Sequence, residues 1–351
     1  MASVVVLLVS CGSSITTTVA PENGLADCLA QLSLAVRVGQ VLVPVVEQSE
    51  ITTSVLLAER GLLGGVVVVG KPNEEIVGAI SVLQESSMTG PLVIAVDEEG
   101  GSVQRLDTLL GRLPSASDMT ELEPRQIELV VADHTEEIAR LGFTVVLAPV
   151  LDVGAGPGIG SRSFGDNPDV VVTYGRAFAE GVIGGGLTPV AKHFPGHGRA
   201  DADSHEVLPV TPPFSDLVAF DLLPWQSLVE ETAVMVGHLV VPDLTGGLPA
   251  SLSVSAIGGL LREELNFGGV VFTDDLAMNA IREIATIPEA AVMSLVAGAD
   301  LLVAGGIDGV ITIAWEILAA LDDGRLKIER LNEAVQRAFT LRGVNPCNLL
   351  S

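Results

Sequence analysis

Residues 269–278 read GVVFTDDLAM, a short apolar run followed by two carboxylates and the start of a helical stretch. A run this apolar, without alternating polar residues, is typical of a strand that is buried on both faces of a parallel sheet. A charge gains nothing inside such a strand, so Asp274 and Asp275 mark its carboxyl end. Successive side chains of a strand point in opposite directions, so we expect only one of the two carboxylates to face a given site.

Similar apolar runs, rich in Val, recur along the chain with longer amphipathic stretches between them. The expected strands are Gln40 to Val46, Gly65 to Gly70, Leu92 to Asp97, Thr144 to Asp152, Pro189 to His193, Val234 to His238, Gly269 to Asp274 and Leu301 to Ala304. The expected helices are Pro72 to Ser87, Glu123 to Leu141, Asn167 to Gly184, Ile257 to Leu265, Pro288 to Ala299, Ile311 to Leu321 and Ile328 to Leu341. Eight strand and helix units predict an α/β fold, a single (β/α)8 barrel without a second sandwich domain. A doubly wound sheet is the alternative, but no GxGxxG motif follows the first strand.

Composition supports one compact domain. The 351 residues are 48% hydrophobic with 38 glycines and only 3% aromatics, which excludes a disordered chain and a repetitive fibre. The formal net charge of -26 would repel a phosphate backbone, so nucleic acid is not an expected partner, and anionic membranes are disfavoured too. The acidic residues are scattered, so they are better explained as a solvated surface than as a binding device.

The amino terminus resembles the signal of a bacterial lipoprotein. Leu8-Val9-Ser10-Cys11 ends a short apolar run, as in a lipobox whose cysteine is lipidated, although no basic residue precedes it. On this interpretation, residues 1–20 are a signal and tether, residues 21–351 are the catalytic domain, and the protein lies in the cell envelope. A first strand or frayed terminus, with a cytoplasmic protein, is the alternative. In an oxidising compartment Cys28 and Cys347 are one possible disulfide pair, and two buried free thiols are the other reading.

Polar residues end five of the expected strands. Asp97, Asp152, Lys192-His193, His238 and Asp274 each follow an apolar run. Catalytic groups of a (β/α)8 barrel lie at the carboxyl ends of its strands, which is where these residues would meet. Any one aspartate could be a helix N-cap, but the whole set is poorly explained in that way.

A glycine-punctuated loop follows the fifth strand. Residues 192–205 contain KHFPGHG and then DSH, which bring three of the five histidines and a carboxylate close together. Loops of this kind carry catalytic groups or cover active sites. A metal-dependent hydrolase, with His193, His197, Asp203 and His205 as ligands, is therefore one candidate function.

These motifs resemble those of glycoside hydrolase family 3, and more narrowly its single-domain β-N-acetylglucosaminidases of the NagZ type. The resemblance rests on KHFPGHG (192–198) with DSH (203–205), AVDEEGGSVQRL (95–106), SRSFGDNP (161–168) and FTDDLAM (272–278), in the family's order. It extends from about Leu32 to the final helices. Two positions depart from the usual pattern, Glu98 where many members have a histidine and Ser102 where many have a basic residue, which leaves fine substrate preference open.

The resemblance implies the roles of the site residues. Asp274 would be the nucleophile, and His205, partnered by Asp203, the general acid and base. An imidazole, whose ordinary pKa is about 6.5, can give and take a proton near neutral pH, which a retaining glycosidase requires. Substrate-binding residues would be Asp97, Arg105, Arg162, Lys192 and His193. His238 would lie behind the residues that touch the sugar, and His134, in an expected helix, would be structural.

The resulting hypothesis is a retaining exo-β-N-acetylglucosaminidase that removes terminal N-acetylglucosamine from muropeptide fragments of peptidoglycan. The expected partner is this carbohydrate substrate alone, with no cofactor or metal, a monomeric protein and membrane contact only through a lipid on Cys11. A catalytically inactive, sugar-binding surface lipoprotein is a third alternative beside the metal-dependent hydrolase. The resemblance implies an intact nucleophile and dyad, which favours the enzyme.

Overall fold

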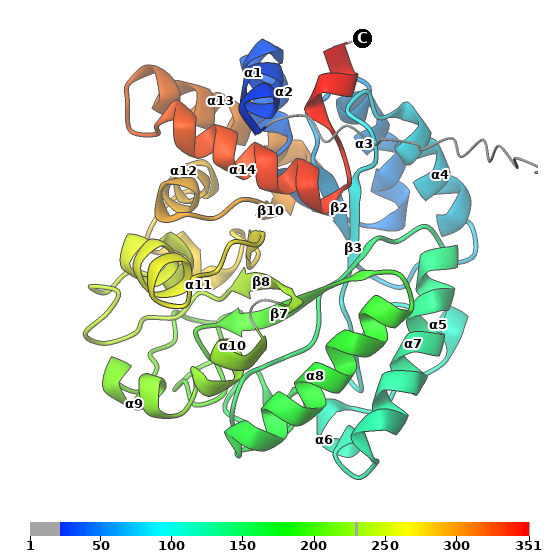
Figure 1. Ribbon diagram of the computed structural model, residues 1–351, viewed down its shortest axis with the longest axis vertical. Helices are drawn as coiled ribbons and strands as arrows, with labels where there is room; N and C mark the ends of the chain where they lie inside the picture. The colour runs from blue at the N-terminus through cyan, green and yellow to red at the C-terminus, as the bar shows by residue number, and fades with distance from the viewer. Residues whose placement is uncertain (1–21, 229–230, 351) are drawn as a thin grey trace, which may run out of the picture.

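The computed structural model describes residues 22–228 and 231–350, and its centre is an eight-stranded parallel sheet (Figure 1). The strands neighbour one another in the order β10-β1-β2-β3-β6-β7-β8-β9. A parallel bridge between Phe272 and Leu301 joins the two outer strands, so that the sheet closes into a barrel. The strands are β1 (Leu42–Val46), β2 (Gly65–Val68), β3 (Val93–Val96), β6 (Val145–Val146), β7 (Thr188–Phe194), β8 (Ala233–Val236), β9 (Val271–Thr273) and β10 (Leu302–Gly306). The predicted (β/α)8 barrel is confirmed, and the doubly wound alternative is wrong.

Two separate hydrophobic layers follow from the alternation of side chains along the strands. Val67, Ala95 and Val303 belong to a small inner cluster, whereas Val66, Ile94 and Leu302, one residue earlier in each strand, belong to the large cluster shared with the helices. Side chains of alternate residues therefore fill the barrel and cover its outside. The inner cluster consists mainly of Val, Ala and Leu, which explains how a chain with few aromatic residues fills a closed barrel.

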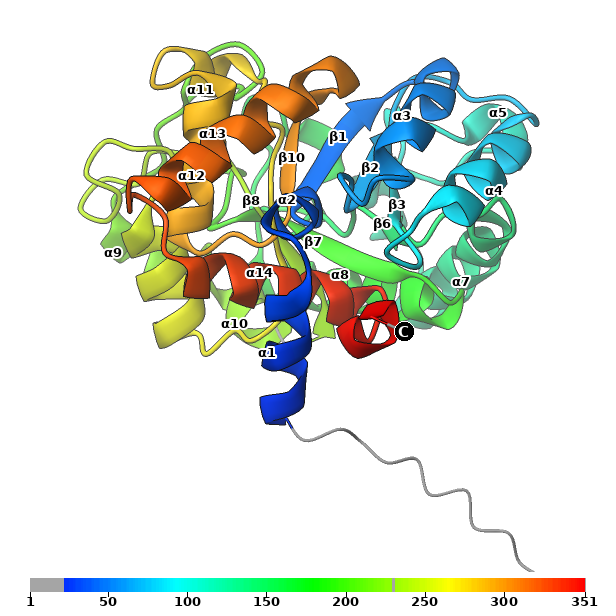
Figure 2. The same cartoon turned by 90° about the horizontal axis from the view of Figure 1, so that it is seen from above.

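Helices surround the barrel (Figures 1 and 2). The predicted helices correspond to α4 (Ile76–Ser86), α7 (Pro124–Arg140), α8 (Pro168–Gly184), α12 (Ile287–Ala297), α13 (Val310–Asp322), α14 (Ile328–Leu341) and, with π-type hydrogen bonds, η5 (Ser255–Glu264). The remaining α-helices are shorter and were not predicted: α1 (Glu22–Gln31), α2 (Leu34–Gly39), α3 (Ile51–Ala58), α5 (Asp107–Leu110), α6 (Ala116–Met119), α9 (Phe214–Ala219), α10 (Leu223–Leu228) and α11 (Asn279–Arg282). A small hairpin of β4 (Glu98–Gly100) and β5 (Val103–Gln104) was not predicted either. None of the described helices is long and apolar enough to cross a membrane.

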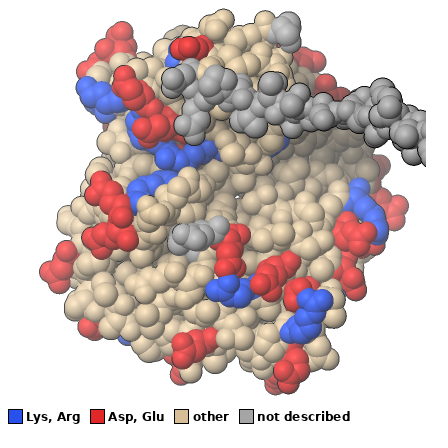
Figure 3. Space-filling view, viewed as in Figure 1, with Lys and Arg blue, Asp and Glu red and all other residues tan. Residues whose placement is uncertain are grey.

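The last α-helix, α14, lies across the end of the barrel where the strands begin. Asp300, which is fully buried there just before β10, accepts charged hydrogen bonds from Arg262 (2.6 Å), Arg330 (2.6 Å) and Arg337 (3.2 Å). Two of these arginines belong to α14, so one carboxylate joins the helix to the sheet. Figure 3 shows acidic and basic side chains scattered singly or in small groups over this side of the molecule, as expected for a solvated surface.

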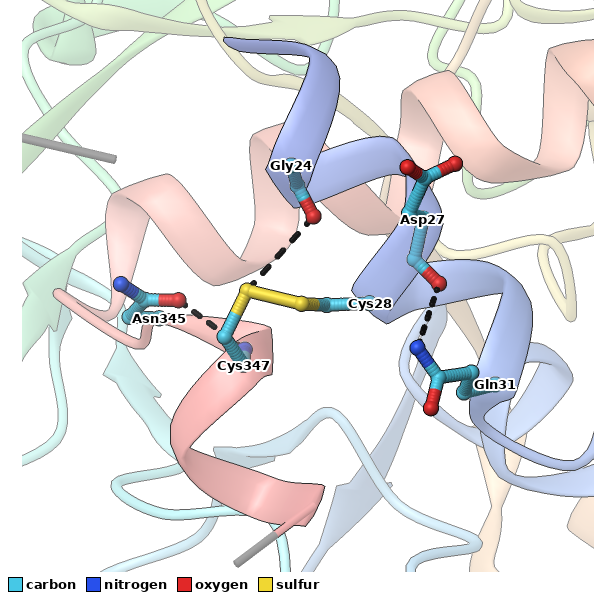
Figure 4. The surroundings of a disulfide bond; sticks show 6 residues. All are labelled: Gly24, Asp27, Cys28, Gln31, Asn345 and Cys347. Carbon is cyan, nitrogen blue, oxygen red and sulfur yellow. Dashed lines mark hydrogen bonds between the residues drawn. A yellow bond between two sulfur atoms is a disulfide. The ribbon is translucent and has the colours of Figure 1, made fainter. Parts of the chain in front are cut away.

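A disulfide joins α1 to the end of the chain (Figure 4). The Sγ atoms of Cys28 and Cys347 are 2.12 Å apart, although the two residues are separated by 319 positions in the sequence. Cys347 lies in the short helix η7 (Pro346–Leu350), where its backbone N–H donates to Asn345 Oδ1 at 2.9 Å. Cys11 lies outside the described residues, so its lipidation and the division at residue 20 stay predictions.

Candidate active site

A cavity of about 230 Å³ opens at the carboxyl ends of the strands. Its inner wall is apolar and includes Val67, Leu147 and Met235 from the inner cluster of the barrel. Its polar lining contains every predicted catalytic or substrate-binding residue except Asp203: Asp97, Arg105, Arg162, Lys192, His193, His205 and Asp274. Asp203 lies directly behind His205 and contacts its ring. The barrel thus brings polar residues from four separate stretches of the sequence, 97–105, 162, 192–205 and 274, to one small site.

Asp274 follows the last residue of β9, and its carboxylate faces the cavity. Its Oδ1 accepts a hydrogen bond from the backbone N–H of Asp275 at 2.9 Å. Burial would raise the pKa of Asp274, but the neighbouring His238 and His193 and this N–H group outweigh burial and lower it. The carboxylate is therefore ionised near neutral pH, as a nucleophile must be.

Asp275 also lines the cavity, so the expectation that only one carboxylate faces the site is wrong. The reason is that β9 ends at Thr273, and the alternation of a strand does not extend to residues beyond its end. Asp275 Oδ1 nevertheless accepts hydrogen bonds from the backbone N–H groups of Ala277 (3.0 Å) and Gly305 (2.9 Å). Burial and the charge of Asp274 raise the pKa of Asp275, so the two neighbours are shifted in opposite directions.

His205 lies on the loop after β7, with 68% of its side chain exposed. Its Nδ1 is 2.8 Å from Asp203 Oδ1, and the same oxygen accepts the backbone N–H of His205 at 2.9 Å. Burial would raise the pKa of Asp203, but these hydrogen bonds and the charge of His205 lower it. With Nδ1 held by a carboxylate, Nε2 is the ring nitrogen that can exchange a proton with a substrate.

Close contact between glycines holds this loop in place. The backbone N–H of Gly156 donates to the carbonyl of Gly198 at 2.8 Å, and a Cβ on Gly198 would lie 2.2 Å from the carbonyl oxygen of Val153. Only glycine permits so close an approach of two backbones. On the other side of the loop, the Asn279 side-chain amide donates to the carbonyl of His205 at 3.0 Å. Asn279 begins α11, a few residues after Asp274, so this bond connects the segment of the nucleophile to the loop of the histidine.

A buried network of charges forms the opposite wall. Lys192, whose side chain is 2% exposed, lies 2.7 Å from Asp97 and 2.5 Å from Glu99. Arg162 donates two hydrogen bonds of 2.8 Å to the same Glu99 carboxylate. Burial alone would raise the pKa of Glu99, but Lys192 and Arg162 lower it from 4.5 to about 2. Each charge is thus paired, and the network presents fixed donors and acceptors to the cavity.

Comparison with known proteins identifies the family. Residues 33–341 match the model of the glycosyl hydrolase family 3 N terminal domain. The chain belongs to glycoside hydrolase family 3. It is 40% identical over 282 residues to the beta-hexosaminidase LpqI of Mycobacterium tuberculosis, which covers 77% of this chain and 72% of that relative. A beta-hexosaminidase of Xylella fastidiosa is 35% identical over 239 residues, or 65% of this chain and 71% of the relative.

Solved structures of family 3 enzymes have the same fold. The structure of M. tuberculosis LpqI superposes with a TM-score of 0.86 at 37% identity, covering 92% of this chain and 97% of that one. A family 3 beta-N-acetylglucosaminidase from Paenibacillus gives a TM-score of 0.82 at 31% identity, covering 91% of this chain and 64% of that one. The resemblance read from the motifs is confirmed, and the protein is a glycoside hydrolase.

Other histidines of this family 3 enzyme support the site. His193 Nδ1 lies 2.7 Å from the buried Asp152, whose pKa burial would raise but His193 lowers. His238 is fully buried, with Nδ1 2.7 Å from Ser251 Oγ and Nε2 2.9 Å from the Asp275 carbonyl oxygen. His238 does not line the cavity, and its place behind the sugar-binding residues stays a prediction. Burial lowers the pKa of His238, and its Nε2–H donates to that carbonyl.

Glu98 and His134 form a second buried pair. Glu98 accepts hydrogen bonds from the backbone N–H of Arg105 (2.9 Å) and Gln104 Nε2 (2.8 Å), and His134 Nε2 on α7 is 3.0 Å from it. The carboxylate thus fixes the hairpin that carries Arg105. The Arg105 guanidinium forms an ion pair with Asp97 at 3.7 Å, and among the described residues its buried Nε has no hydrogen-bond partner. Arg105 therefore keeps donors available for a ligand.

The structure also bears on the alternative metal site and on one site residue that was not predicted. Among residues 22–228 and 231–350, no group of three or more His, Cys, Asp or Glu side chains is placed to hold a metal ion, so His193, His197, Asp203 and His205 do not assemble as ligands. Glu99 was not predicted as a site residue. The sequence offered one sign of its role, because Glu99 is the second glutamate of the AVDEEGG motif. Its place beside Lys192, however, depends on a hairpin that was not predicted.

Proposed function

We propose that this family 3 enzyme is a retaining exo-β-N-acetylglucosaminidase that releases terminal β-linked N-acetylglucosamine through a covalent glycosyl-enzyme. The β-N-acetylhexosaminidase class is that of its named relatives. The observation that carries the retaining mechanism is the meeting of an ionised carboxylate, Asp274, and a carboxylate-held imidazole, His205, in one cavity of about 230 Å³. A cavity of this size fits one terminal sugar, which supports exo action.

The reaction proceeds in two displacements. In the first, an Asp274 oxygen attacks the anomeric carbon while His205 Nε2 gives its proton to the departing glycosidic oxygen, so the bond to the leaving group breaks as the ester to Asp274 forms. In the second, His205 takes a proton from water, whose oxygen attacks the anomeric carbon and releases Asp274. Asp203 stabilises the imidazolium and keeps Nδ1 toward itself in both steps. Attack twice from opposite sides retains the β configuration.

Asp275 is the residue to consider for a second mechanism, in which the substrate's own acetamido group acts as the nucleophile. The acetamido oxygen of the substrate can act as an internal nucleophile, and enzymes of that type use a pair of neighbouring carboxylates. Here the Asp275 carboxylate is already bound to two backbone N–H groups, and its pKa is raised. These contacts leave Asp274 as the better placed nucleophile.

A mechanism-based donor tests this assignment. A 5-fluoro N-acetylglucosaminyl donor should leave a glycosyl ester on the peptide that contains Asp274, detected by mass spectrometry after digestion. Asp274→Ala should lose both turnover and labelling, whereas Asp275→Asn should still be labelled. If no adduct forms and a thiazoline that mimics an oxazoline inhibits tightly, the acetamido group is the nucleophile and the proposal is wrong.

His205→Ala tests the second half of the mechanism. Hydrolysis of substrates with poor leaving groups should fall by about a hundredfold or more, because they need protonation to depart. Activated aryl glycosides should be affected much less in the first step, and Asp203→Asn should give a milder form of the same pattern. Equal losses for both classes of substrate would contradict the role of His205 as acid.

We propose further that the natural substrates are muropeptide fragments of peptidoglycan and that the enzyme lies in the cell envelope. Support comes from the lipobox-like Leu8 to Cys11 and from the disulfide between Cys28 and Cys347, which suits an oxidising compartment. Expression in a bacterium with lipoprotein processing should give a membrane-associated protein, and Cys11→Ala should release it into the soluble fraction. Unchanged fractionation would refute the anchor.

A further inference from the structure

His197 is a buried histidine that the proposed mechanism does not use. It lies in the loop after β7, between Gly196 and Gly198. Its Nε2 lies 3.3 Å from Ser204 Oγ, whereas its Nδ1 is buried without a hydrogen-bond partner among the described residues. A buried ring nitrogen that is left unpaired costs free energy, so packing alone explains His197 poorly. The contact with Ser204 is the one side-chain hydrogen bond that this ring makes in the described part of the chain.

Ser204 is the middle residue of the DSH motif and the only one of its three residues that is buried. The residues on either side of it form the catalytic dyad of Asp203 and His205. The side chain of Asp203 is partly exposed and that of His205 is mostly exposed, so packing alone does not fix them. Because Ser204 has a peptide bond to each member of the dyad, the contact of its hydroxyl with His197 fixes the backbone from which both side chains project.

His197 is held in turn by Asp152, a fully buried residue that follows β6. Asp152 Oδ1 accepts the backbone N–H of His197 at 2.6 Å, and its Oδ2 lies 2.7 Å from His193 Nδ1. His193 lines the sugar cavity, so one carboxylate contacts both the wall of the cavity and the segment that anchors the dyad. A buried group with these partners has little freedom to move, and it gives the cavity wall and the dyad a common point of attachment.

The surroundings of His197 suit a residue that holds its neighbour better than one that transfers a proton to substrate. His197 does not line the sugar cavity. Burial lowers the pKa of His197 by more than the charge of Asp152 raises it, which disfavours the charged ring. A serine hydroxyl can donate or accept a hydrogen bond, so Ser204 can pair with Nε2 in either neutral tautomer of the ring. The contact therefore persists whichever ring nitrogen carries the proton.

We infer that His197 is a positioning residue, which through Ser204 holds the catalytic dyad at a fixed place beside the sugar cavity. The inference rests on the proposed function, because it assumes that His205 is the acid and base. It goes beyond that function by assigning the position of the dyad to a buried ring outside the cavity. Loss of the contact between His197 and Ser204 should therefore impair proton transfer by His205 and leave the binding of the sugar largely intact.

Kinetics of variants at the two partners test the inference. Ser204→Ala and His197→Phe each remove the contact, and Ser54→Ala is the matched control, since Ser54 is a buried serine on α3 whose hydroxyl donates to the carbonyl of Glu50 at 3.1 Å. For substrates with poor leaving groups, kcat/KM should fall about three- to tenfold in the first two variants, mainly through kcat, as expected for one lost hydrogen bond. Activated aryl glycosides should be little affected, because they depart without protonation. The double variant should lose no more than the worse single variant, since both changes break the same contact. Ser54→Ala should match the wild type.

Hydrogen exchange separates this inference from the proposed function. The backbone N–H groups of His205 and Glu206 both bond to Asp203, at 2.9 Å to its Oδ1 and at 3.0 Å to its carbonyl. Their exchange, measured by mass spectrometry without substrate, should be faster in Ser204→Ala and His197→Phe than in the wild type and Ser54→Ala. Ser204→Ala removes only a hydroxyl and decides the case if His197→Phe does not fold.

Two results would overturn the inference. One is unchanged exchange in Ser204→Ala. The other is an equal loss of kcat/KM for both classes of substrate in folded Ser204→Ala, when His205→Ala does discriminate between them. If His205→Ala shows no preference for activated leaving groups, the proposed function fails, and the exchange rates still decide whether His197 and Ser204 hold the loop.

Discussion

Glu99→Gln should weaken both the stability of the barrel and the binding of substrate. The substitution keeps the size of the side chain and removes the charge that Lys192 and Arg162 share. The pKa of Glu99 is lowered from 4.5 to about 2, and since one pKa unit corresponds to 1.36 kcal/mol, its surroundings favour the ionised form by about 3 kcal/mol. Removing one partner of a buried ion pair costs about 3–5 kcal/mol, which agrees with this value.

The stabilisation that Glu99 provides should decrease as the pH falls. A carboxyl whose pKa is lower in the folded protein stabilises it above the pKa of the unfolded chain, and this stabilisation is lost as the pH falls toward the folded value. The contribution of Glu99 should thus be complete at neutral pH, begin to decline near pH 4.5 and be about half as large at pH 3.

Urea unfolding of the wild type, Glu99→Gln and Glu99→Asp between neutral pH and pH 3 measures this difference in the free energy of unfolding. Glu99→Gln should also raise KM for an aryl N-acetylglucosaminide, because Lys192 and Arg162 lose the anion that holds them at the cavity. The reasoning would be refuted if the free energies of unfolding of the wild type and Glu99→Gln differed by well below 1 kcal/mol at neutral pH, or if their difference did not become smaller in acid. The network would then contribute no net stabilisation.

Three other features give further predictions. In the wild-type protein, Asn279→Ala should lower the turnover of substrates with poor leaving groups several-fold, because the Asn279 amide holds the loop that carries His205. In a His205→Ala protein the same substitution should have little effect, and additive losses of activity would contradict this role. Alkylation without reductant should find neither Cys28 nor Cys347 free, and a labelled thiol would refute the bond in solution. Asp300→Asn should lower the free energy of unfolding by about 3–5 kcal/mol, with KM unchanged in the folded protein because Asp300 lies at the opposite end of the barrel.

The strands and the long helices could be predicted from the sequence because their patterns are local. A run such as Val93 to Val96 has no polar interruption, and α7 begins at Pro124 with a capping box between Glu123 and Gln126. The helix α3 was missed because its sequence, ITTSVLLA, groups the polar residues and most of the apolar residues into two runs and shows no clear helical period.

The candidate site could be predicted only where a motif carried it. Asp274 and His205 lie in motifs, and the barrel rule placed the carboxyl ends of the strands together. Glu99 and Asp275 lie in the same motifs, but their positions in the site depend on where a strand stops and a hairpin turns, and such boundaries cannot be read from the sequence to within one or two residues.

The place of α1 decides how the enzyme would be held by its amino terminus. Figure 2 shows α1 and the carboxyl terminus together on the side of the barrel where the strands begin, opposite the sugar cavity. A tether that enters through α1 would turn the mouth of the cavity outward, toward arriving fragments. The bond from Cys28 to Cys347 would also carry any pull on that tether directly into the last turn of the chain.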